Sequence, residues 1–113
     1  MPQVNINVSK KLDDSTKNKL QLEIGNNMSI LPGKNIENTM ICINDGVSMF
    51  KNGEAVEGIF ADIRLYKSSP EESKKELAEK LFSIFENVLG IKSNAVYMNF
   101  TEMPNWASGG SYF

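Results

Sequence analysis

Histidine is absent from this 113-residue sequence, and cysteine occurs once, as Cys42. Because histidine is the commonest general base in hydrolases, its absence excludes the usual serine and cysteine triads. A single cysteine excludes an internal disulfide framework and the paired-cysteine motifs of redox and zinc proteins. We expect Cys42 to be a small, buried strand residue, and we expect neither a metal ion nor a cofactor.

The sequence also has no long apolar run and no excess of positive charge. Its first ten residues, MPQVNINVSK, contain neither the apolar part of a secretion signal nor the start of a transmembrane helix. The 12 basic and 14 acidic residues are interspersed and give a net charge of −2, which does not fit a nucleic-acid-binding surface. We therefore expect a single cytoplasmic domain over residues 1–113, with neither a membrane nor a nucleic acid as partner.

Proton transfer without histidine needs another group that titrates near neutral pH. An unperturbed α-amino group titrates at about 7.7–8.0, closer to neutrality than the remaining side chains. The sequence begins Met1-Pro2, so removal of Met1 would leave the secondary amine of Pro2 at the N-terminus. An N-terminal amine is therefore one candidate base, and a carboxylate with a shifted pKa is the other.

Apolar residues follow the periods of strands and helices along the chain. Residues Val4 to Val8 alternate apolar and polar side chains, as in a strand with one buried face. Asp13 and Asp14 are candidate N-caps for a first helix, which Pro32-Gly33 ends.

A second helix has clear limits in the sequence. Ser69 fits its N-cap, Pro70 its first helical position, and Gly90 the residue after its last turn. Together the patterns predict strands at 4–8, 39–44, 58–66 and 95–101, helices at 14–31 and 70–89, and a short strand in the C-terminal tail.

These elements form the same unit twice, because each half has a strand, a helix, a stop containing glycine and lysine, and a second strand. Right-handed crossovers then pack both helices on the same face of one sheet. We expect an α/β fold in which a tandem β-α-β repeat forms a four-stranded sheet with two helices on one face. The other face carries some apolar side chains and lacks a cover, which predicts that the chain oligomerises.

Six short segments stand out by their order and spacing: Met1-Pro2, Gly33-Lys34, Asp45, Ser48-Met49-Phe50, residues 96–100 (VYMNF) and the C-terminal GSYF. Together they resemble the tautomerase superfamily, within it the branch of macrophage migration inhibitory factor (MIF) and D-dopachrome tautomerase. The resemblance covers essentially the whole chain. It implies a homotrimer with a central channel and three pockets at subunit boundaries, each with an N-terminal proline.

The resemblance also implies an activity, the interconversion of keto and enol forms of aryl 2-oxo acids such as phenylpyruvate. Pro2 corresponds to the catalytic base and Lys34 to a cation that binds the substrate carboxylate. Leu65 corresponds to a pocket residue whose backbone holds the substrate. Tyr97 and Asn99 correspond to pocket residues given by the neighbouring subunit. A neutral amine, an ammonium group and a phenol or amide suit these roles chemically.

Some positions depart from the family pattern. Asn38 stands where the mammalian cytokine has a pocket tyrosine, and Ser108 where it has a tryptophan. Trp106, two residues earlier, is the candidate to fill that space. The cytokine's CxxC segment aligns near residues 57–60, which contain no cysteine, so we expect no thiol–disulfide activity.

Alternatives remain open at this stage. Arg64, the only arginine, resembles the arginines that related dehalogenases and decarboxylases use, although strand parity points it away from Leu65. Without the resemblance, Lys34 also fits a cation that complements a helix end. A non-catalytic MIF-like signalling or binding protein that keeps the trimer is the alternative to an enzyme.

Overall fold

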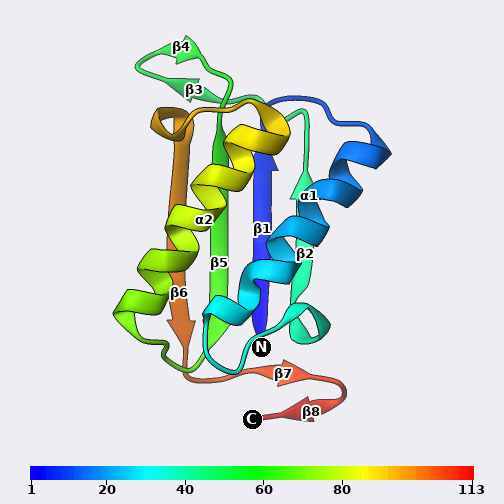
Figure 1. Cartoon of the computed structure of the whole chain (residues 1–113), viewed down its shortest axis with the longest axis vertical. Coiled ribbons are helices and arrows are strands. Elements are labelled where there is room, and N and C mark those ends of the chain that lie inside the picture. Colours follow the sequence, from blue (N-terminus) through cyan, green and yellow to red (C-terminus); the bar gives the residue numbers. More distant parts are fainter.

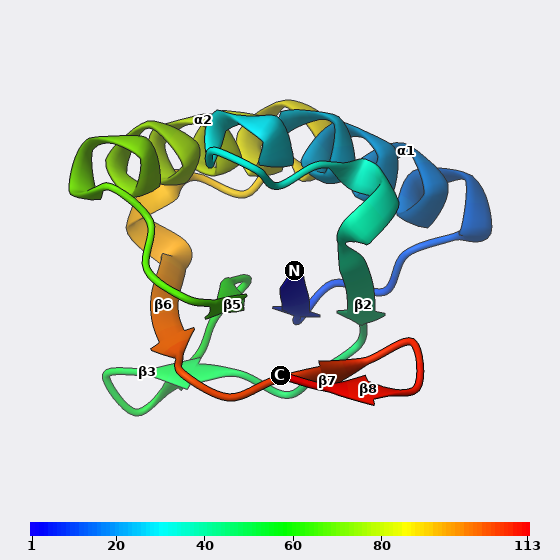
Figure 2. The ribbon, with the colours of Figure 1, turned by 90° about the horizontal axis from the view of Figure 1, so that it is seen from below.

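The computed structural model describes residues 1–113. Four strands form one mixed sheet in the order β2-β1-β5-β6, with β1 and β5 antiparallel at its centre and a parallel pair on each side. The helices α1 and α2 lie side by side on one face of this sheet (Figure 1 and Figure 2). The predicted four-stranded α/β architecture is therefore confirmed. The elements concerned are β1 (Pro2–Val8), α1 (Asp14–Asn27), β2 (Met40–Asn44), β5 (Ile59–Tyr66), α2 (Glu71–Leu89) and β6 (Val96–Met103).

The core lies between the sheet and the helices and consists of 18 buried apolar residues. Every second residue of β1 and of β5 points into it, which is the alternation expected of strands with one covered face. The largest fully buried side chain is that of Phe85 in α2. Cys42, predicted to be buried, is only half-buried, because it lies on the uncovered face of the edge strand β2.

The first helix is shorter than predicted. Asp13 caps it through a 2.8 Å hydrogen bond from the Thr16 N–H, as expected. Regular α-helix ends at Asn27, however, and a 3₁₀ turn, η1 (Met28–Ile30), follows. Leu31 is extended, with φ −82° and ψ 122°, because the ring of Pro32 excludes a helical conformation for the residue before it.

The second helix begins one residue later than predicted. Pro70 is its N-cap, because the Pro70 carbonyl accepts the first helical bond, from Lys74 N–H, at 3.1 Å. Ser69 does not cap the helix; its N–H donates to the Glu102 carboxylate at 2.7 Å. The predicted end is confirmed, since Gly90 has φ +69°, a left-handed conformation that favours glycine.

Two hairpins extend from opposite ends of the sheet (Figure 1), and both lie on the side away from the helices (Figure 2). The first pairs β3 (Phe50–Lys51) with β4 (Glu54–Ala55) across Asn52-Gly53, both of which have positive φ. Asn-Gly is a typical turn dipeptide, but the sequence patterns predicted no strands beside it. The second pairs β7 (Ala107–Ser108) with β8 (Ser111–Tyr112), so the predicted strand in the tail is part of a hairpin.

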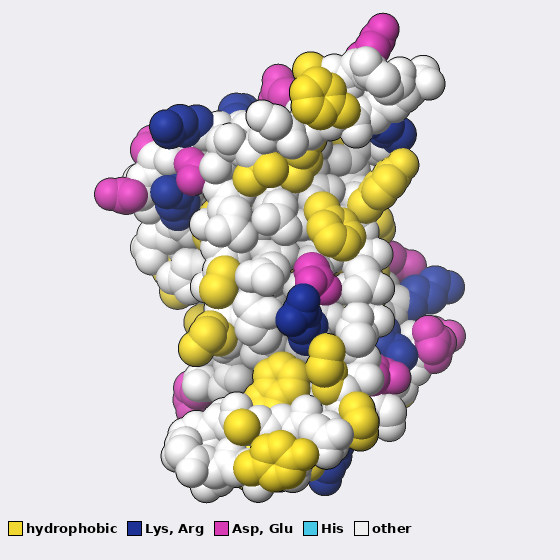
Figure 3. Space-filling model, turned by 180° about the vertical axis from the view of Figure 1, so that it is seen from behind, with side chains coloured by type: hydrophobic (Ala, Val, Ile, Leu, Met, Phe, Trp, Pro, Cys, Tyr) yellow, Lys and Arg dark blue, Asp and Glu magenta, His cyan; other side chains and the backbone are white.

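The face of the sheet opposite the helices is uncovered. Figure 3 shows apolar side chains toward both ends of this face, with a pair of opposite charges between them. Asp62 and Arg64 of β5 alternate with its buried residues and so point to this face, where their charged atoms lie 3.2 Å apart. Side chains of this sheet face and of the two hairpins stay largely exposed, including Met40 (67%), Phe50 (71%), Tyr97 (61%) and Tyr112 (74%). We call this side the open face.

Candidate active site

A pocket of about 530 Å³ lies at the end of the sheet where the chain begins. Three segments form it: the start of β1, the loop that leads into β2, and the C-terminal hairpin. Its lining includes the predicted residues Pro2 and Trp106, and polar side chains predominate in the loop before β2. The lining residues are Met1, Pro2, Gln3, Glu37, Asn38, Thr39, Met40, Trp106, Ala107, Ser108 and Gly109. We call it the N-terminal pocket.

Pro2 and Leu65 are directly opposite each other, on β1 and β5. Pro2 is buried, and the Leu65 side chain is fully buried in the core. The Leu65 side chain is therefore not available to a ligand, and its role in a site stays a prediction. The next residue, Tyr66, donates its N–H to the Met1 carbonyl at 3.2 Å.

Lys34 reaches the same end of the sheet from the loop after α1. Its Nζ donates to the Tyr66 carbonyl at 3.2 Å. Burial, and then the positive charge of Lys34, lower the pKa of the Met1 amine from its usual 8.0 to about 6. An amine in this place is therefore largely neutral at physiological pH and has a free lone pair.

The C-terminal hairpin is attached to this end of the sheet through aromatic contacts. The Tyr66 ring stacks on Phe113, with centroids 5.5 Å apart, and meets Trp106 at 6.4 Å in a tilted arrangement. Ser108 Oγ lies 2.7 Å from the Met1 sulfur. Trp106 is half-buried and forms part of the pocket wall, in the region predicted for it.

Tyr97 and Asn99 lie elsewhere in the same chain. Leu65, opposite Pro2, pairs with Glu102 on β6, whereas Tyr97 pairs with Phe60. Five residues of extended strand, roughly 17 Å, separate Tyr97 from Glu102. The Asn99 amide donates to Thr101 and Asp62 on the open face. One chain thus brings Pro2, Lys34, Leu65 and Trp106 to the same end of the sheet, where Pro2 and Trp106 line the N-terminal pocket, and leaves Tyr97 and Asn99 apart from them.

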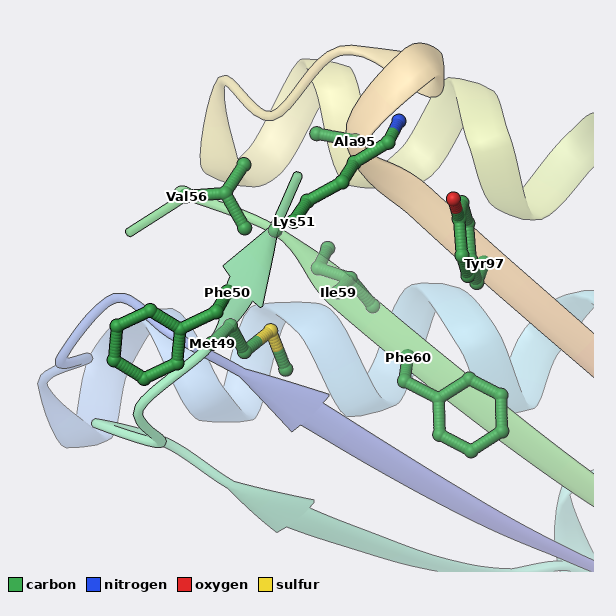
Figure 4. Close-up of a pocket in the computed structure, with 9 residues that line it drawn as sticks. Met49, Phe50, Lys51, Val56, Ile59, Phe60, Ala95 and Tyr97 are labelled. Atoms are coloured by element: carbon green, nitrogen blue, oxygen red, sulfur yellow. The ribbon is translucent and has the colours of Figure 1, made fainter. Parts of the chain in front are cut away.

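A second, more apolar pocket of about 220 Å³ lies at the other end of the open face, and Tyr97 is one of its lining residues. Figure 4 shows Met49, Phe50 and Lys51 of the first hairpin around it, with Phe60 and Tyr97 on the sheet. Lys51 Nζ lies 5.3 Å from the centre of the Tyr97 ring, a cation–π contact. Each end of the open face therefore carries a pocket that is open to solvent.

Several lining residues of the N-terminal pocket, and Tyr66 beside it, had no signal in the sequence. Tyr66 connects Met1, Lys34 and the C-terminal hairpin, yet nothing in its sequence context marks it beyond its place after Leu65. Arg64 lies on the open face and pairs with Asp62, so it is not among the side chains that line this pocket.

The chain holds no group of three or more His, Cys, Asp or Glu side chains placed to bind a metal ion. Neither helix is both long enough and apolar enough to cross a membrane.

Comparison with known proteins finds similarity in structure. No protein-family model and no curated protein matches the chain by sequence. The crystal structure of MIF2 from Leishmania major superposes with a TM-score of 0.92 at 18% identity, over 100% of this chain and 97% of that one. A macrophage migration inhibitory factor-like protein from Entamoeba histolytica gives 0.87 at 25% identity, over 99% and 98% of the two chains. An asymmetric trimer of fused 4-OT gives 0.87 at 16% identity, over 97% and 94%.

The chain has the tautomerase-superfamily fold. The similarity extends over the whole length of these chains, so it includes both helices, the sheet and the two hairpins. The resemblance predicted from six short segments is confirmed at the level of the fold. In this fold Pro2 is the first residue of the central strand β1, and Lys34 lies near the Met1 amine that precedes it.

Proposed function

We propose that this protein is a keto–enol tautomerase for aryl 2-oxo acids such as phenylpyruvate, with the amine of Pro2 as its general base once Met1 is removed. The observation that carries this proposal is the environment of the N-terminal amine. Burial and Lys34 lower the pKa of the Met1 amine, one residue before Pro2, to about 6, and the same two causes favour a neutral Pro2 amine at physiological pH in a protein without histidine.

The reaction needs only a proton carrier and groups that stabilise the enolate. In the direction keto to enol, the neutral amine of Pro2 takes a proton from the carbon next to the 2-oxo group. Negative charge then develops on the carbonyl oxygen, which receives a proton to complete the enol. The reaction is an isomerisation, so the atoms balance without a cofactor.

Lys34 and Leu65 suit the substrate-binding roles. The Lys34 ammonium is a charged donor for the substrate carboxylate, and it already donates to a backbone carbonyl beside Pro2. The buried side chain of Leu65 leaves its backbone as the group available to the substrate. Trp106 supplies an apolar wall for the aryl ring.

We further propose that Tyr97 and Asn99 complete the pocket from a neighbouring subunit of a homotrimer. Within one chain they lie too far from Pro2 to take part, so a second copy is the simplest source. The exposed apolar side chains of the open face give that copy a surface to cover. A structurally similar 4-OT protein forms an asymmetric trimer. From this position, a phenol or amide donor can stabilise the charge on the enolate oxygen.

The test compares two preparations that differ only at the N-terminus, each verified by mass determination. One begins at Pro2, and the other retains Met1, which converts the Pro2 nitrogen into a non-basic amide. We expect the processed protein to convert enol-phenylpyruvate, followed by ultraviolet absorbance, and the Met1 form to be inactive. Equal rates would rule out Pro2 as the base. Inactivity of both, with normal assembly, would instead favour the non-catalytic binding protein.

A further inference from the structure

The loop that carries Lys34 has an internal hydrogen-bond network of its own. This loop, residues 33–39, connects the end of the first helical segment to β2 and forms one wall of the N-terminal pocket. We call it the Lys34 loop. Its only regular element is one 3₁₀ turn, η2 (Ile36–Asn38), so repetitive secondary structure does not explain its shape.

Asn38 is bonded to the residues on both sides of Lys34. Its side-chain Oδ1 accepts the N–H of Asn35 at 3.1 Å, and its Nδ2 donates to the Gly33 carbonyl at 3.4 Å. Asn35 reciprocates, because its Oδ1 accepts the Asn38 N–H at 3.0 Å. The pair is a capping box made of two asparagines.

Two more contacts attach the Lys34 loop to the rest of the fold. The Lys34 N–H donates to the Leu31 carbonyl at 3.0 Å, so the start of the loop is bonded to the end of the first helical segment. Ile36 lies directly on Gly25 of α1, so closely that an added Cβ there would be 2.6 Å from Ile36 Cγ1. With its backbone held on both sides, Lys34 extends to the Tyr66 carbonyl beside Pro2.

We infer that Asn38, paired with Asn35, is a positioning residue: its amide holds the Lys34 loop so that the Lys34 ammonium group stays at the Tyr66 carbonyl, at the end of the sheet where Pro2 lies. This inference rests on the proposed function, because it assigns Lys34 a substrate carboxylate to bind. Asn38 itself borders the pocket, whereas Asn35 does not. A role through Lys34 therefore predicts that both asparagines matter, and a direct contact with substrate predicts that Asn38 alone does.

The test is a double-mutant cycle in the processed protein with phenylpyruvate as substrate. Lys34→Ala should lower kcat/KM roughly ten- to a hundredfold by removing the carboxylate contact. Asn38→Ala and Asn35→Ala should each lower it roughly tenfold by misplacing that contact. Neither should lower it further in a Lys34→Ala background, because no ammonium then remains to be positioned. Asn27→Ala is the matched control, since Asn27 is also half-buried and donates to a backbone carbonyl, at 2.7 Å, away from this loop.

A second readout separates this inference from the proposed activity. Bromopyruvate and bromoacetone both alkylate an amine with loss of bromide and a proton, but only bromopyruvate carries a carboxylate. The ratio of their rates at Pro2, measured by mass spectrometry, reports carboxylate recognition alone. We expect the ratio of the bromopyruvate rate to the bromoacetone rate to fall in Lys34→Ala, Asn35→Ala and Asn38→Ala. In Asn27→Ala it should equal the ratio of the protein without substitutions.

The outcomes are distinct. A processed protein that reacts faster with bromopyruvate than with bromoacetone, but does not convert phenylpyruvate, contradicts the proposed function. In that case the alkylation ratios of the asparagine variants still decide the positioning role. Full, additive effects of Asn38→Ala in the Lys34→Ala background, or an unaffected ratio in Asn35→Ala, overturn the positioning role. Asn35 is exposed, so its substitution provides this answer even where Asn38→Ala does not fold.

Discussion

Leu65 shows how a single residue can belong to the core and to a site at once. Its side chain is fully buried under the helices, while its backbone lies opposite Pro2 at the pocket. Lys34 and Tyr66 similarly combine structural and chemical contacts, since the Lys34 ammonium donates to the Tyr66 carbonyl. The property that decides the chemistry of this site is the pKa of the N-terminal amine beside these residues.

The activity of the processed protein should rise with pH as the Pro2 amine loses its proton. Burial and Lys34 lower the pKa of the Met1 amine to about 6, and Pro2 is more buried than Met1 and near the same lysine. The midpoint in kcat/KM should therefore lie below the usual 7.7–8.0 of an α-amino group. Lys34→Ala should move it upward, because one of the two main causes is removed and burial remains. A midpoint that stays in place in Lys34→Ala would contradict this.

Lys34→Ala should also weaken binding of the substrate carboxylate. A charge-assisted hydrogen bond contributes about 1.5–3 kcal/mol, equivalent to a ten- to hundredfold loss in kcat/KM. Lys10→Ala is a matched control, because Lys10 also donates to a backbone carbonyl, that of Leu89, at 3.3 Å. Steady-state kinetics with phenylpyruvate measure the difference. Equal kinetics of the two variants would reduce Lys34 to a helix-end lysine.

At the scale of elements, long-range contacts decide where helices begin and how they pack. Glu102, at the end of β6, accepts the Ser69 N–H before α2 and pairs with Lys74 inside it at 3.1 Å. Ile36 of η2 packs on Gly25 of α1. Neither contact has a signal in the local sequence. The first connects α2 to the end of the sheet where Pro2 lies, and the second connects α1 to the loop beside the N-terminal pocket.

Glu102→Ala should lower the melting temperature by a few degrees at neutral pH. The Ser69 N–H, and then Lys74, lower the pKa of the Glu102 carboxyl below its ordinary 4.5. A carboxylate with a lowered pKa stabilises the fold above that ordinary value, and the contribution disappears as the pH falls through the folded-state pKa. Thermal unfolding of both proteins at neutral and acidic pH measures this. Glu79→Ala, on the exposed side of α2, is the control. A difference that persists unchanged in acid would contradict the assignment.

Gly25→Ala should destabilise the protein, although alanine favours a helix by about 1 kcal/mol over glycine. The added methyl group would lie 2.6 Å from Ile36 Cγ1, so η2 or the helix must move. Such overpacking costs about 1–3 kcal/mol. Urea unfolding measures the loss, and Gly25→Ala combined with Ile36→Ala should recover part of it because the clash is removed. Stabilisation by Gly25→Ala alone would show that Ile36 moves aside freely.

At the scale of the whole molecule, the open face is the feature that one chain leaves incomplete. It carries exposed apolar side chains at both ends, and each end has a pocket open to solvent. The proposed trimer would bring the Tyr97 end of one copy to the Pro2 end of the next. We expect light scattering to give a mass three times that of one chain. A stable monomer at micromolar concentration would contradict this.

A mixing experiment tests whether the active site crosses between subunits. Processed Tyr97→Ala should lose roughly three- to tenfold in kcat/KM, the equivalent of one hydrogen bond. The form that retains Met1 should be inactive but keeps Tyr97. Subunits of both kinds, dissociated and reassembled together, should be more active than the sum of the two proteins reassembled separately, because mixed boundaries pair a free Pro2 with an intact Tyr97. No gain in the mixture would place Tyr97 outside the site.

Sequence patterns alone predicted the two helices, the four strands of the sheet and their layers, but not the end of α1 or the strands β3 and β4. These predictions used local signals: the alternation in Val4 to Val8, the Asp13 cap and Gly90. They were confirmed because such signals depend only on neighbouring residues in the chain. The local rules failed where a distant group intervened. Ser69 looked like an N-cap, but its N–H belongs to Glu102, and Pro70 takes the cap position.

The candidate site was decided by the tertiary structure. Pro2 and Lys34 were predicted by resemblance, but only the register of β1 with β5 brings Pro2 opposite Leu65, and only the Asn35–Asn38 pair explains how Lys34 is held. The register of β6 with β5 puts Tyr97 at the far end of the sheet. Strand register and loop conformation depend on contacts between residues distant in the chain, and no local pattern records them.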